Sequence, residues 1–296
     1  MNETRQPFQL DINDLSRAES LVAPTIAFCE AQSFPLGAAM IRHHWQGAPA
    51  QPVIEALAAY QNPDGGFGNE LEVDIKSPLS NPFAARLAMQ VMLALNEDAG
   101  NELRHRLGRW LTTNQNADGD WHFSPAVYES PLPFWFAGWT FPSLNPACCI
   151  AGLATRLGLA TPEMLGRVTA LFAERASLEQ ARTGEFYDVL PYVEYVPWIE
   201  LEVESKDAYL HAIAEGIVRM TETGKYEDAS HFFDHALAGG SVFRRMIPTE
   251  FVAAQASRLL SEVAADGGWP TPYDQGWRAH STMGAMVTLA RLRDGV

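Results

Sequence analysis

The stretch that decides the fold is YQNPDGGFGNELEVD, residues 60–74. Its segment from Asn62 to Gly66 contains a proline and two glycines, which interrupt a helix and favour a turn. The apolar pattern of residues 53–61 predicts a helix before this turn, and Asn81-Pro82 predicts the start of another helix after it. The stretch is therefore expected to join two helices, with a run of acids directly after the turn.

The same turn recurs along the chain. Residues 115–121 (QNADGDW) and 265–269 (ADGGW) repeat the Asp-Gly-aromatic order. The first two aspartates are 54 positions apart (118 − 64), and the third follows after 148 (266 − 118), which is roughly three such steps. Weaker turns at Gly184 and Gly224 fall between them. Five or six repeats of helix, turn and helix are typical of stacked helix pairs, and no segment predicts a sheet.

Helical spacing of apolar residues predicts most of the secondary structure. We expect Asn145-Pro146 and Thr161-Pro162 to begin helices as Asn81-Pro82 does, and Gly158 to end one. Residues 184–204 carry two prolines, and a degenerate turn is predicted at their start. Residues 1–12 are expected to form a polar arm, and residues 13–296 a single domain. The predicted helices cover residues 15–30, 53–61, 81–95, 101–114, 145–158, 207–223, 249–263 and 277–292, with a further one from 161.

The composition restricts the partners. The chain has 296 residues and a formal net charge of -15, from 36 acids against 21 lysines and arginines, which disfavours nucleic acid and anionic membranes. Three cysteines make no disulfide framework, and no apolar run reaches the ~18 residues of a spanning helix. These features predict a soluble, cytoplasmic protein without stable membrane insertion. No cofactor and no metal site are predicted, and the metal requirement and the oligomeric state stay open.

The turn sequence resembles the repeat motif of a known superfamily. Gln61-Asn62-Pro63-Asp64-Gly65-Gly66-Phe67-Gly68 is similar to the Gln-x-x-Asp-Gly-Gly-aromatic repeat of squalene and related terpene cyclases, which also occurs in protein prenyltransferase β-subunits. Residues 115–121 and 266–269 match it in part. The resemblance implies an all-α fold, an (α/α) toroid of about five to six helical hairpins around a central cavity, with long loops at one end.

The chain also departs from these families. It lacks the Asp-x-Asp-Asp acid of class II terpene cyclases, and the nearest analogue is Glu72-Val73-Asp74. The Asp, Cys and His that bind zinc in prenyltransferases have counterparts in type only, at Cys148, Cys149 and His280, without a matching local motif. A helix start at Pro146 would also place the dipole near Cys148, which can lower the pKa of a thiol; the alternative is that both cysteines are buried small residues, since no base is visible as a partner. The chain is therefore identified as a divergent, single-toroid relative.

Glu70, Glu72 and Asp74 are the first catalytic candidates. They alternate along the chain, so an extended segment would place them on one face. Neighbouring acids raise each other's pKa, and an acid that stays protonated near neutral pH can protonate an alkene, an epoxide or a glycosidic oxygen. The alternative is a solvated acidic loop in an acidic protein.

Aromatic residues supply candidates for substrate contacts. Residues 128–141 (YESPLPFWFAGWTF) contain six aromatics, and loops at one end of a toroid would cover its cavity. Trp135 and Trp139 are therefore predicted to contact substrate, together with Phe67 of the first turn, since aromatic faces stabilise cations and stack on sugars. The alternatives are a long loop packed over the barrel end and, for Phe67, an aromatic packed beneath a turn whose aspartate caps the backbone.

Two further segments mix acids, aromatics and a histidine. In residues 187–204, Asp188 and Tyr192 are candidates for a second cavity wall; an exposed amphipathic segment is the alternative. In residues 270–280, Asp274 and His280 are a candidate acid–base pair, with capping and a satisfied histidine as the alternative. Here Tyr273 and Trp277 complete the predicted substrate contacts.

Three functions agree with these patterns. The resemblance implies a cyclase- or isomerase-like enzyme with a small apolar, terpenoid-like substrate, an acid as proton donor and aromatics that stabilise cations. The second function is a carbohydrate-active toroid, a hydrolase or lyase for a sugar-like ligand. The third is a toroid that binds or scaffolds without catalysis. Cavity polarity distinguishes the first two, because a sugar site needs two carboxyl groups and an open cleft.

Overall fold

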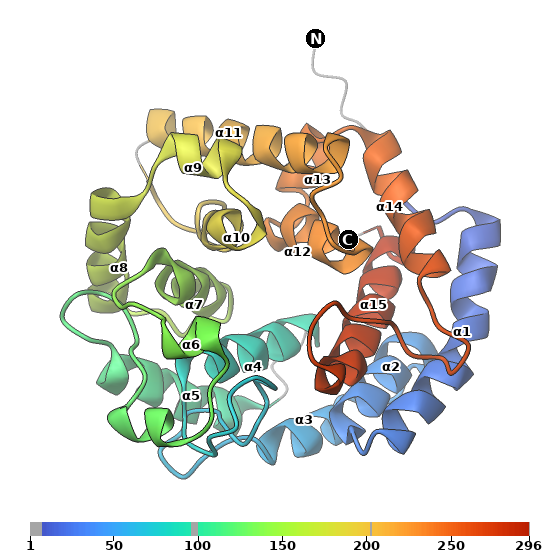
Figure 1. The fold of residues 1–296 in the computed structure, drawn as a ribbon, viewed down its shortest axis with the longest axis horizontal. Helices are drawn as coiled ribbons and strands as arrows, with labels where there is room; N and C mark the ends of the chain where they lie inside the picture. The colour runs from blue at the N-terminus through green and yellow to red at the C-terminus, as the bar shows by residue number, and fades with distance from the viewer. Residues whose placement is uncertain (1–7, 96–99, 202, 296) are drawn as a thin grey trace. The chain divides into compact units, whose positions relative to one another are not determined.

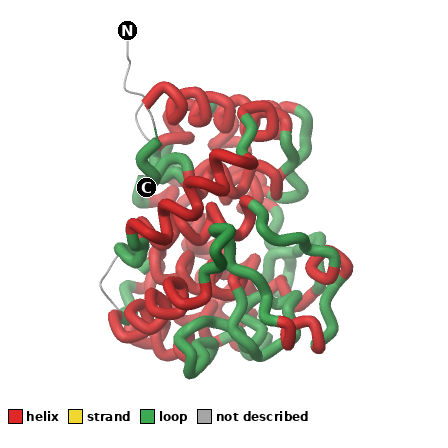
Figure 2. The backbone as a smooth tube through the Cα atoms, turned by 90° about the vertical axis from the view of Figure 1, so that its left-hand side faces the viewer, coloured by secondary structure: helices red, strands yellow, loops and turns green. Residues whose placement is uncertain are grey.

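The computed structural model of the protein describes residues 8–95, 100–201 and 203–295. Over these ranges it contains fifteen α-helices and two short 3-10 helices, and no β-strand (Figure 1). Figure 2 shows the described backbone as helix and loop alone. The all-α prediction is confirmed, and the toroid stays a prediction. The first helix, α1, begins at Ile12, and residues 1–7 of the predicted arm lie outside the described ranges.

The chain forms two compact units. The first comprises Met1–Val53, Ala181–Val189 and Asp207–Val296. Its helices are α1 (Ile12–Ala31), α2 (Pro35–Gln46), most of α11 (Val203–Glu222), α12 (Ala229–Ala238), α13 (Val242–Met246), α14 (Thr249–Ser261), η2 (Gln275–Trp277) and α15 (Arg278–Arg293). Helices α1, α2 and α15 pack against one another, and α14 contacts both α1 and α12.

The second unit comprises Ile54–Gln180 and Leu190–Lys206. Its helix α7 (Leu144–Arg156) packs against α4 (Pro82–Ala94) and α8 (Pro162–Arg175). Helix α5 (Asn101–Asn114) has the predicted bounds. The aromatic loop contains η1 (Pro125–Glu129) and α6 (Phe134–Ala137). Three shorter helices have residues in both units: α3 (Gln51–Ala58), α9 (Leu178–Thr183) and α10 (Phe186–Tyr195).

Three helices were predicted to begin at a proline, and in two of them the residue before the proline caps the helix with its side chain. The side chain of Asn81 accepts a hydrogen bond from the Ala84 amide, and Thr161 accepts one from Met164. Asn145 differs, because its φ of -104° and ψ of 116° are not helical, and its side-chain oxygen accepts from the Cys149 thiol at 3.7 Å. Regular helix therefore begins after Asn145, as expected, but without an Asn cap on the backbone amides.

The predicted turn at 184–188 was wrong beyond its first residues, because α10 begins at Phe186. This helix contains Pro191, which removes one backbone hydrogen bond. Five of its apolar side chains are at most 2 % exposed: Val189, Leu190, Tyr192, Val193 and Tyr195. Burial of this apolar surface offsets the loss of the backbone hydrogen bond at Pro191. The position of a proline in the sequence does not by itself reveal this stabilisation.

The three Asp-Gly turns share one hydrogen-bond pattern. Each aspartate carboxylate accepts from the backbone amide two residues later, at 3.0 to 3.1 Å: Asp64 from Gly66, Asp118 from Asp120, and Asp266 from Gly268. In the first two copies the glutamine side chain donates both to its own turn and to a neighbouring helix. Gln61 reaches the Leu103 carbonyl at 2.9 Å, and Gln115 reaches that of Met164 at 3.2 Å.

Glycine is required in these turns for two reasons. Gly65, Gly119 and Gly267 have φ of +94°, +95° and +86°. A Cβ atom at these positions would lie 2.4, 2.6 and 2.7 Å from the carbonyl oxygens of Arg106, Arg167 and Pro24, respectively. Each turn therefore docks by its backbone on another helix of its own unit, on α5, α8 and α1 in turn.

The aromatic residue of each turn is buried beneath it. Phe67 and Trp121 are 0 % exposed and Trp269 is 2 % exposed. The indole N–H of Trp121 donates to the Leu111 carbonyl, and that of Trp269 to the Leu259 carbonyl, both at 2.9 Å. The turns thus join helices structurally, as the capping interpretation predicted.

Candidate functional site

The acidic segment after the first turn does not place its carboxylates on one face. It is a series of turns, in which Asn69 and Glu70 have φ of 53° and 62°. Glu70 is exposed and lies 3.1 Å from Lys76, whereas Glu72 is only 8 % exposed. The prediction of a shared face was wrong because the segment is not extended, so period-two alternation does not apply.

Glu72 is nevertheless an unusual carboxyl group. Its pKa is raised to about 8, mainly by burial and also by the nearby charge of Asp74, while the Asp74 amide and Arg86 oppose the shift. The Asp74 amide donates to Oε1 of Glu72 at 3.4 Å. Glu72 therefore carries a proton over much of the neutral range, which is the state that a general acid needs.

Aromatic side chains gather close to this segment. Ile75, whose amide donates to the Glu72 carbonyl at 3.0 Å, belongs to a cluster with Phe83, Phe123, Val127 and Phe136. Trp139 packs on this cluster, with its ring centroid 4.9 Å from that of Phe83. The cluster's members are buried or partly buried, so these rings form a packed layer beside the acidic segment.

The short helix α6 extends from this cluster toward solvent. Phe134 is 84 % exposed and Trp135 is 41 % exposed, and their rings meet edge to face at 5.0 Å. The indole N–H of Trp139 donates to the Ser143 hydroxyl at 3.2 Å. Of the two predicted contacts in this loop, Trp135 therefore presents a free surface and Trp139 is mostly packed.

A buried ion pair lies in the same unit. The guanidinium of Arg86 donates two hydrogen bonds to Glu194, at 2.8 and 2.9 Å, and Gln90 donates a third at 2.9 Å. The Glu194 side chain is only 4 % exposed. Sequence reasoning missed Arg86, which lies in a helix assigned from its apolar stripe. The signal was Glu194 within PYVEYVPW, because an acid inside an apolar run requires a partner.

Tyr192, a predicted substrate contact, is fully buried in this unit. Its hydroxyl accepts from the Ser177 amide at 3.0 Å and donates to Gln180 at 2.7 Å. These bonds join α10 to the region around α9. Phe67 is likewise 0 % exposed beneath its turn. Neither ring has surface free for a ligand in this conformation.

The buried polar groups near the start of α7 do not form a thiol site. Burial raises the pKa of both Cys148 and Cys149 well above the ordinary value, so these residues are buried small side chains, as the alternative predicted, and not reactive thiols. Burial also raises the pKa of Asp120 to about 7, against the opposing hydrogen bonds from the amides of Ser143 and Trp121. In the described chain, no group of three or more His, Cys, Asp or Glu residues is arranged to hold a metal ion.

Asp274 and His280, the predicted acid–base pair, have different surroundings in the structure. The Asp274 carboxylate caps η2 by accepting from the Gly276 amide at 2.8 Å, as the capping alternative predicted. The His280 ring packs 4.3 Å from Phe34 and 5.3 Å from Trp277, centroid to centroid. Catalysis by Asp274 and His280, and substrate contact by Trp277, stay predictions.

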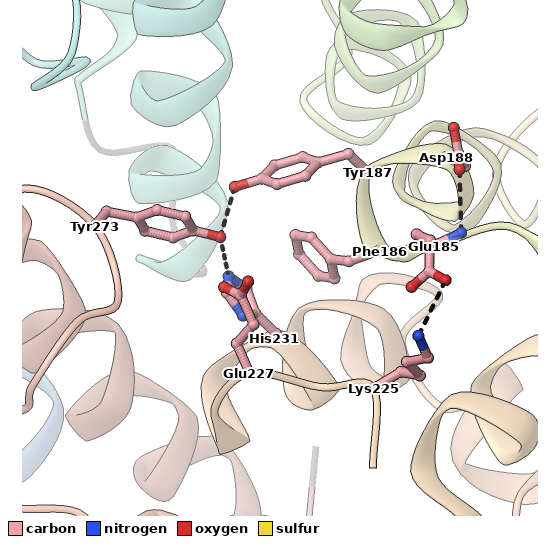
Figure 3. A pocket seen from close by; sticks show the side chains of 8 residues that line it. All are labelled: Glu185, Phe186, Tyr187, Asp188, Lys225, Glu227, His231 and Tyr273. Atoms are coloured by element: carbon pink, nitrogen blue, oxygen red, sulfur yellow. Dashed lines mark hydrogen bonds and ion pairs between the residues drawn. The ribbon is translucent and has the colours of Figure 1, made fainter. Parts of the chain in front are cut away.

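One pocket lies within the first unit, with a volume of about 190 Å³. It brings together two predicted substrate contacts that are far apart in the sequence, Asp188 of α10 and Tyr273 of the loop before η2 (Figure 3). Its other lining residues are Glu185, Phe186, Tyr187, Lys225, Glu227 and His231. Sequence reasoning missed His231 and Glu227, because α12 and the loop before it were not predicted.

A chain of hydrogen bonds crosses this pocket. The phenol of Tyr187 donates to the Tyr273 hydroxyl at 2.9 Å, and the two rings come from different sides of the pocket (Figure 3). The Tyr273 hydroxyl lies 3.2 Å from Nε2 of His231, whose Nδ1 is 3.5 Å from the Asp228 carboxylate. Burial and the charge of Glu227 raise the pKa of Tyr273, so this phenol stays protonated.

Comparison with protein-family models, curated proteins and solved structures gave no match to this chain. The described residues contain no helix with the length and apolarity needed to cross a bilayer. The functional argument therefore depends on the residues of the two sites themselves.

Proposed function

We propose that this chain is a divergent, terpene-cyclase-like enzyme in which Glu72 is the proton donor. The observation that carries the proposal is the buried Glu72 carboxyl with its pKa raised to about 8. A carboxyl that holds its proton at neutral pH can begin acid-initiated cyclisation or isomerisation without a metal-bound diphosphate. The three Asp-Gly turns support the same assignment, because the motif that resembles the cyclase repeat forms one geometry at all three positions.

In the proposed reaction, the π electrons of a substrate alkene take the Glu72 proton and form a C–H bond. A carbocation develops at the neighbouring carbon, and ring closure or rearrangement moves it. Loss of a proton to a carboxylate, for which Asp74 is the nearby candidate, restores a neutral product. Aromatic faces stabilise such cations, and Trp135 is the candidate ring, an exposed side chain next in sequence to Phe136 of the cluster that includes Ile75 and Phe83.

The proposed architecture is a single toroid of about five to six helical hairpins in the cytoplasm. The close approach of each Asp-Gly turn to a helix that the turn itself does not directly precede or follow supports this architecture. The third turn, for example, contacts α1 within the first unit. Cys29, Cys148 and Cys149 are free thiols, which agrees with a reducing compartment.

The test uses polyprenyl alkenes with the purified protein in D₂O, followed by mass spectrometry of the products, because protonation of an alkene forms a C–D bond that does not exchange with solvent. The proposal predicts products that contain one deuterium from the initiating step. Glu72→Gln, which cannot donate, should lower the rate by at least about 10²-fold, the lower range for loss of a general acid. Glu102→Gln, an exposed acid of α5, is the matched control. Full activity of Glu72→Gln rejects the assignment.

A carbohydrate-active enzyme is the second candidate, and the pocket in the first unit favours it. That pocket combines carboxylates at Glu185, Asp188 and Glu227 with aromatic rings, which are the groups that bind and hydrolyse sugars. Release of reducing ends from oligosaccharides, abolished by Asp188→Asn or Glu227→Gln, would support this candidate over the cyclase. A protein that converts neither substrate class fits the third possibility, a toroid that binds or scaffolds without catalysis.

A further inference from the structure

We propose that the pocket between α10 and α12 of the first unit binds a small organic amine in its protonated form. The proposal stands apart from acid-initiated chemistry at Glu72, since all eight lining residues belong to the first unit and Glu72 to the second. It narrows the ligand of the second candidate function from sugars in general to molecules that carry a cationic nitrogen.

The cavity limits the size of the ligand. Its volume of about 190 Å³ lies below the roughly 300–1,000 Å³ of pockets for drug-sized molecules. The ligand is therefore a small molecule or one small end of a larger molecule. One wall is the start of α10, the facing wall is His231 of α12 with the loop before it, and Tyr273 closes a third side (Figure 3).

The charge of the walls selects a cation. Three carboxylates line the pocket, at Glu185, Asp188 and Glu227, against one ammonium, at Lys225. Nζ of Lys225 lies 3.7 Å from Glu185, so its charge is already directed to one of the three acids. An anionic ligand would meet an excess of negative charge, whereas a protonated amine would reduce it.

Aromatic rings provide the second element of recognition. Phe186, Tyr187 and Tyr273 all line the cavity, and Tyr187 is 54 % exposed. A cation within about 6 Å of such ring faces gains further stabilisation. Recognition by carboxylates and rings together distinguishes an ammonium group from a hydroxyl group of the same size.

Buried hydrogen bonds hold one of these rings in place. The buried His235 ring stacks on Phe186 at 4.6 Å with an interplanar angle of 16°. Its Nε2 lies 3.1 Å from the Phe186 carbonyl, which can only accept, so Nε2 carries the proton. Nδ1 then accepts from the Tyr226 hydroxyl at 3.0 Å. The wall is therefore organised before a ligand arrives, which lowers the entropic cost of binding.

The experiment compares matched pairs of probes that differ only in charge: glucosamine with glucose, cyclohexylamine with cyclohexanol, and 2-aminoethanol with ethylene glycol. Dissociation constants are measured at pH 7 by chemical-shift titration of the full chain. We expect the amine of at least one pair to bind at least about fivefold more tightly than its neutral partner. A factor of about five corresponds to about 1 kcal/mol, which is the upper range for one partly exposed ion pair.

Variants then locate the binding site. Glu227→Gln should weaken amine binding by about fivefold and leave binding of the neutral partner unchanged. Glu222→Gln removes the same charge at an exposed position five residues earlier, outside the pocket, and should have no effect. Equal affinity within every pair overturns the amine assignment and leaves a sugar site intact. If no probe binds, or if Glu227→Gln and Glu222→Gln have equal effects, the proposal that this pocket binds a ligand is wrong. None of these results bears on Glu72.

Discussion

Replacement of Gly65 by alanine tests whether the Asp-Gly turns hold the helices together. At a φ of +94°, an alanine side chain costs roughly 1–2 kcal/mol in backbone strain alone. Its Cβ would also lie 2.4 Å from the Arg106 carbonyl oxygen, where real Cβ contacts are not found under 3.0 Å. Relief of such a clash costs a further ~1–3 kcal/mol. Gly65→Ala is therefore expected to lower the free energy of unfolding by about 3 kcal/mol.

Two other glycines separate these contributions. Gly47 has a φ of +65° with no atom within 4 Å of a built Cβ, so Gly47→Ala should cost only about 1 kcal/mol. Gly166 lies in α8 with equally open space, so Gly166→Ala should be neutral or stabilising by about 0.5–1 kcal/mol. Urea denaturation followed by circular dichroism measures all three variants. An equal cost for Gly65→Ala and Gly47→Ala would refute the close approach of the turn to α5.

Three further predictions concern buried polar groups. Arg86→Met leaves the Glu194 carboxylate buried without its cation and should cost about 3–5 kcal/mol in urea denaturation, whereas Arg86→Met with Glu194→Leu should recover most of that loss. The free energy of unfolding should fall as pH rises from about 4 to 8. Asp120 and Glu72 have pKa values of about 7 and 8 in the folded chain, above ordinary carboxyl values, so the folded chain binds more protons there than the unfolded chain does. Asp120→Asn should flatten this dependence on pH. A free energy of unfolding that rises from pH 4 to 8 would contradict the raised pKa values of Asp120 and Glu72. Tyr226→Phe removes the donor to the buried Nδ1 of His235 and should cost about 1–3 kcal/mol, with Tyr128→Phe, at an exposed ring, as the neutral control.

The helix pattern and the turns could be predicted because their causes are local. The bounds of α5 follow from apolar periodicity and polar ends, and the caps at Asn81 and Thr161 follow from the residue before a proline. The glycines of the turns follow from the backbone that such a turn requires. Helix α10 was missed because burial of its apolar residues outweighs Pro191, which is a property of the folded chain.

The sites were less predictable because they depend on distant contacts. Glu72 was named for its neighbours in sequence, but its raised pKa comes first from burial. The partner of Glu194 lies 108 positions away at Arg86, and that of Tyr273 lies 42 positions away at His231. No local spacing encodes these pairs, although an acid in an apolar run and a tyrosine beside Asp274 marked one member of each.

The protonation state of Glu72 tests the proposed function most directly. Carbon-13 NMR of the Glu side-chain carboxyls, titrated from pH 4 to pH 10 and assigned by the signal lost in Glu72→Gln, measures its pKa. We predict a midpoint near 8, with the carboxyl still mostly protonated at pH 7. A midpoint near the ordinary value of about 4.3 would show that Glu72 is ionised at neutral pH and cannot supply the initiating proton.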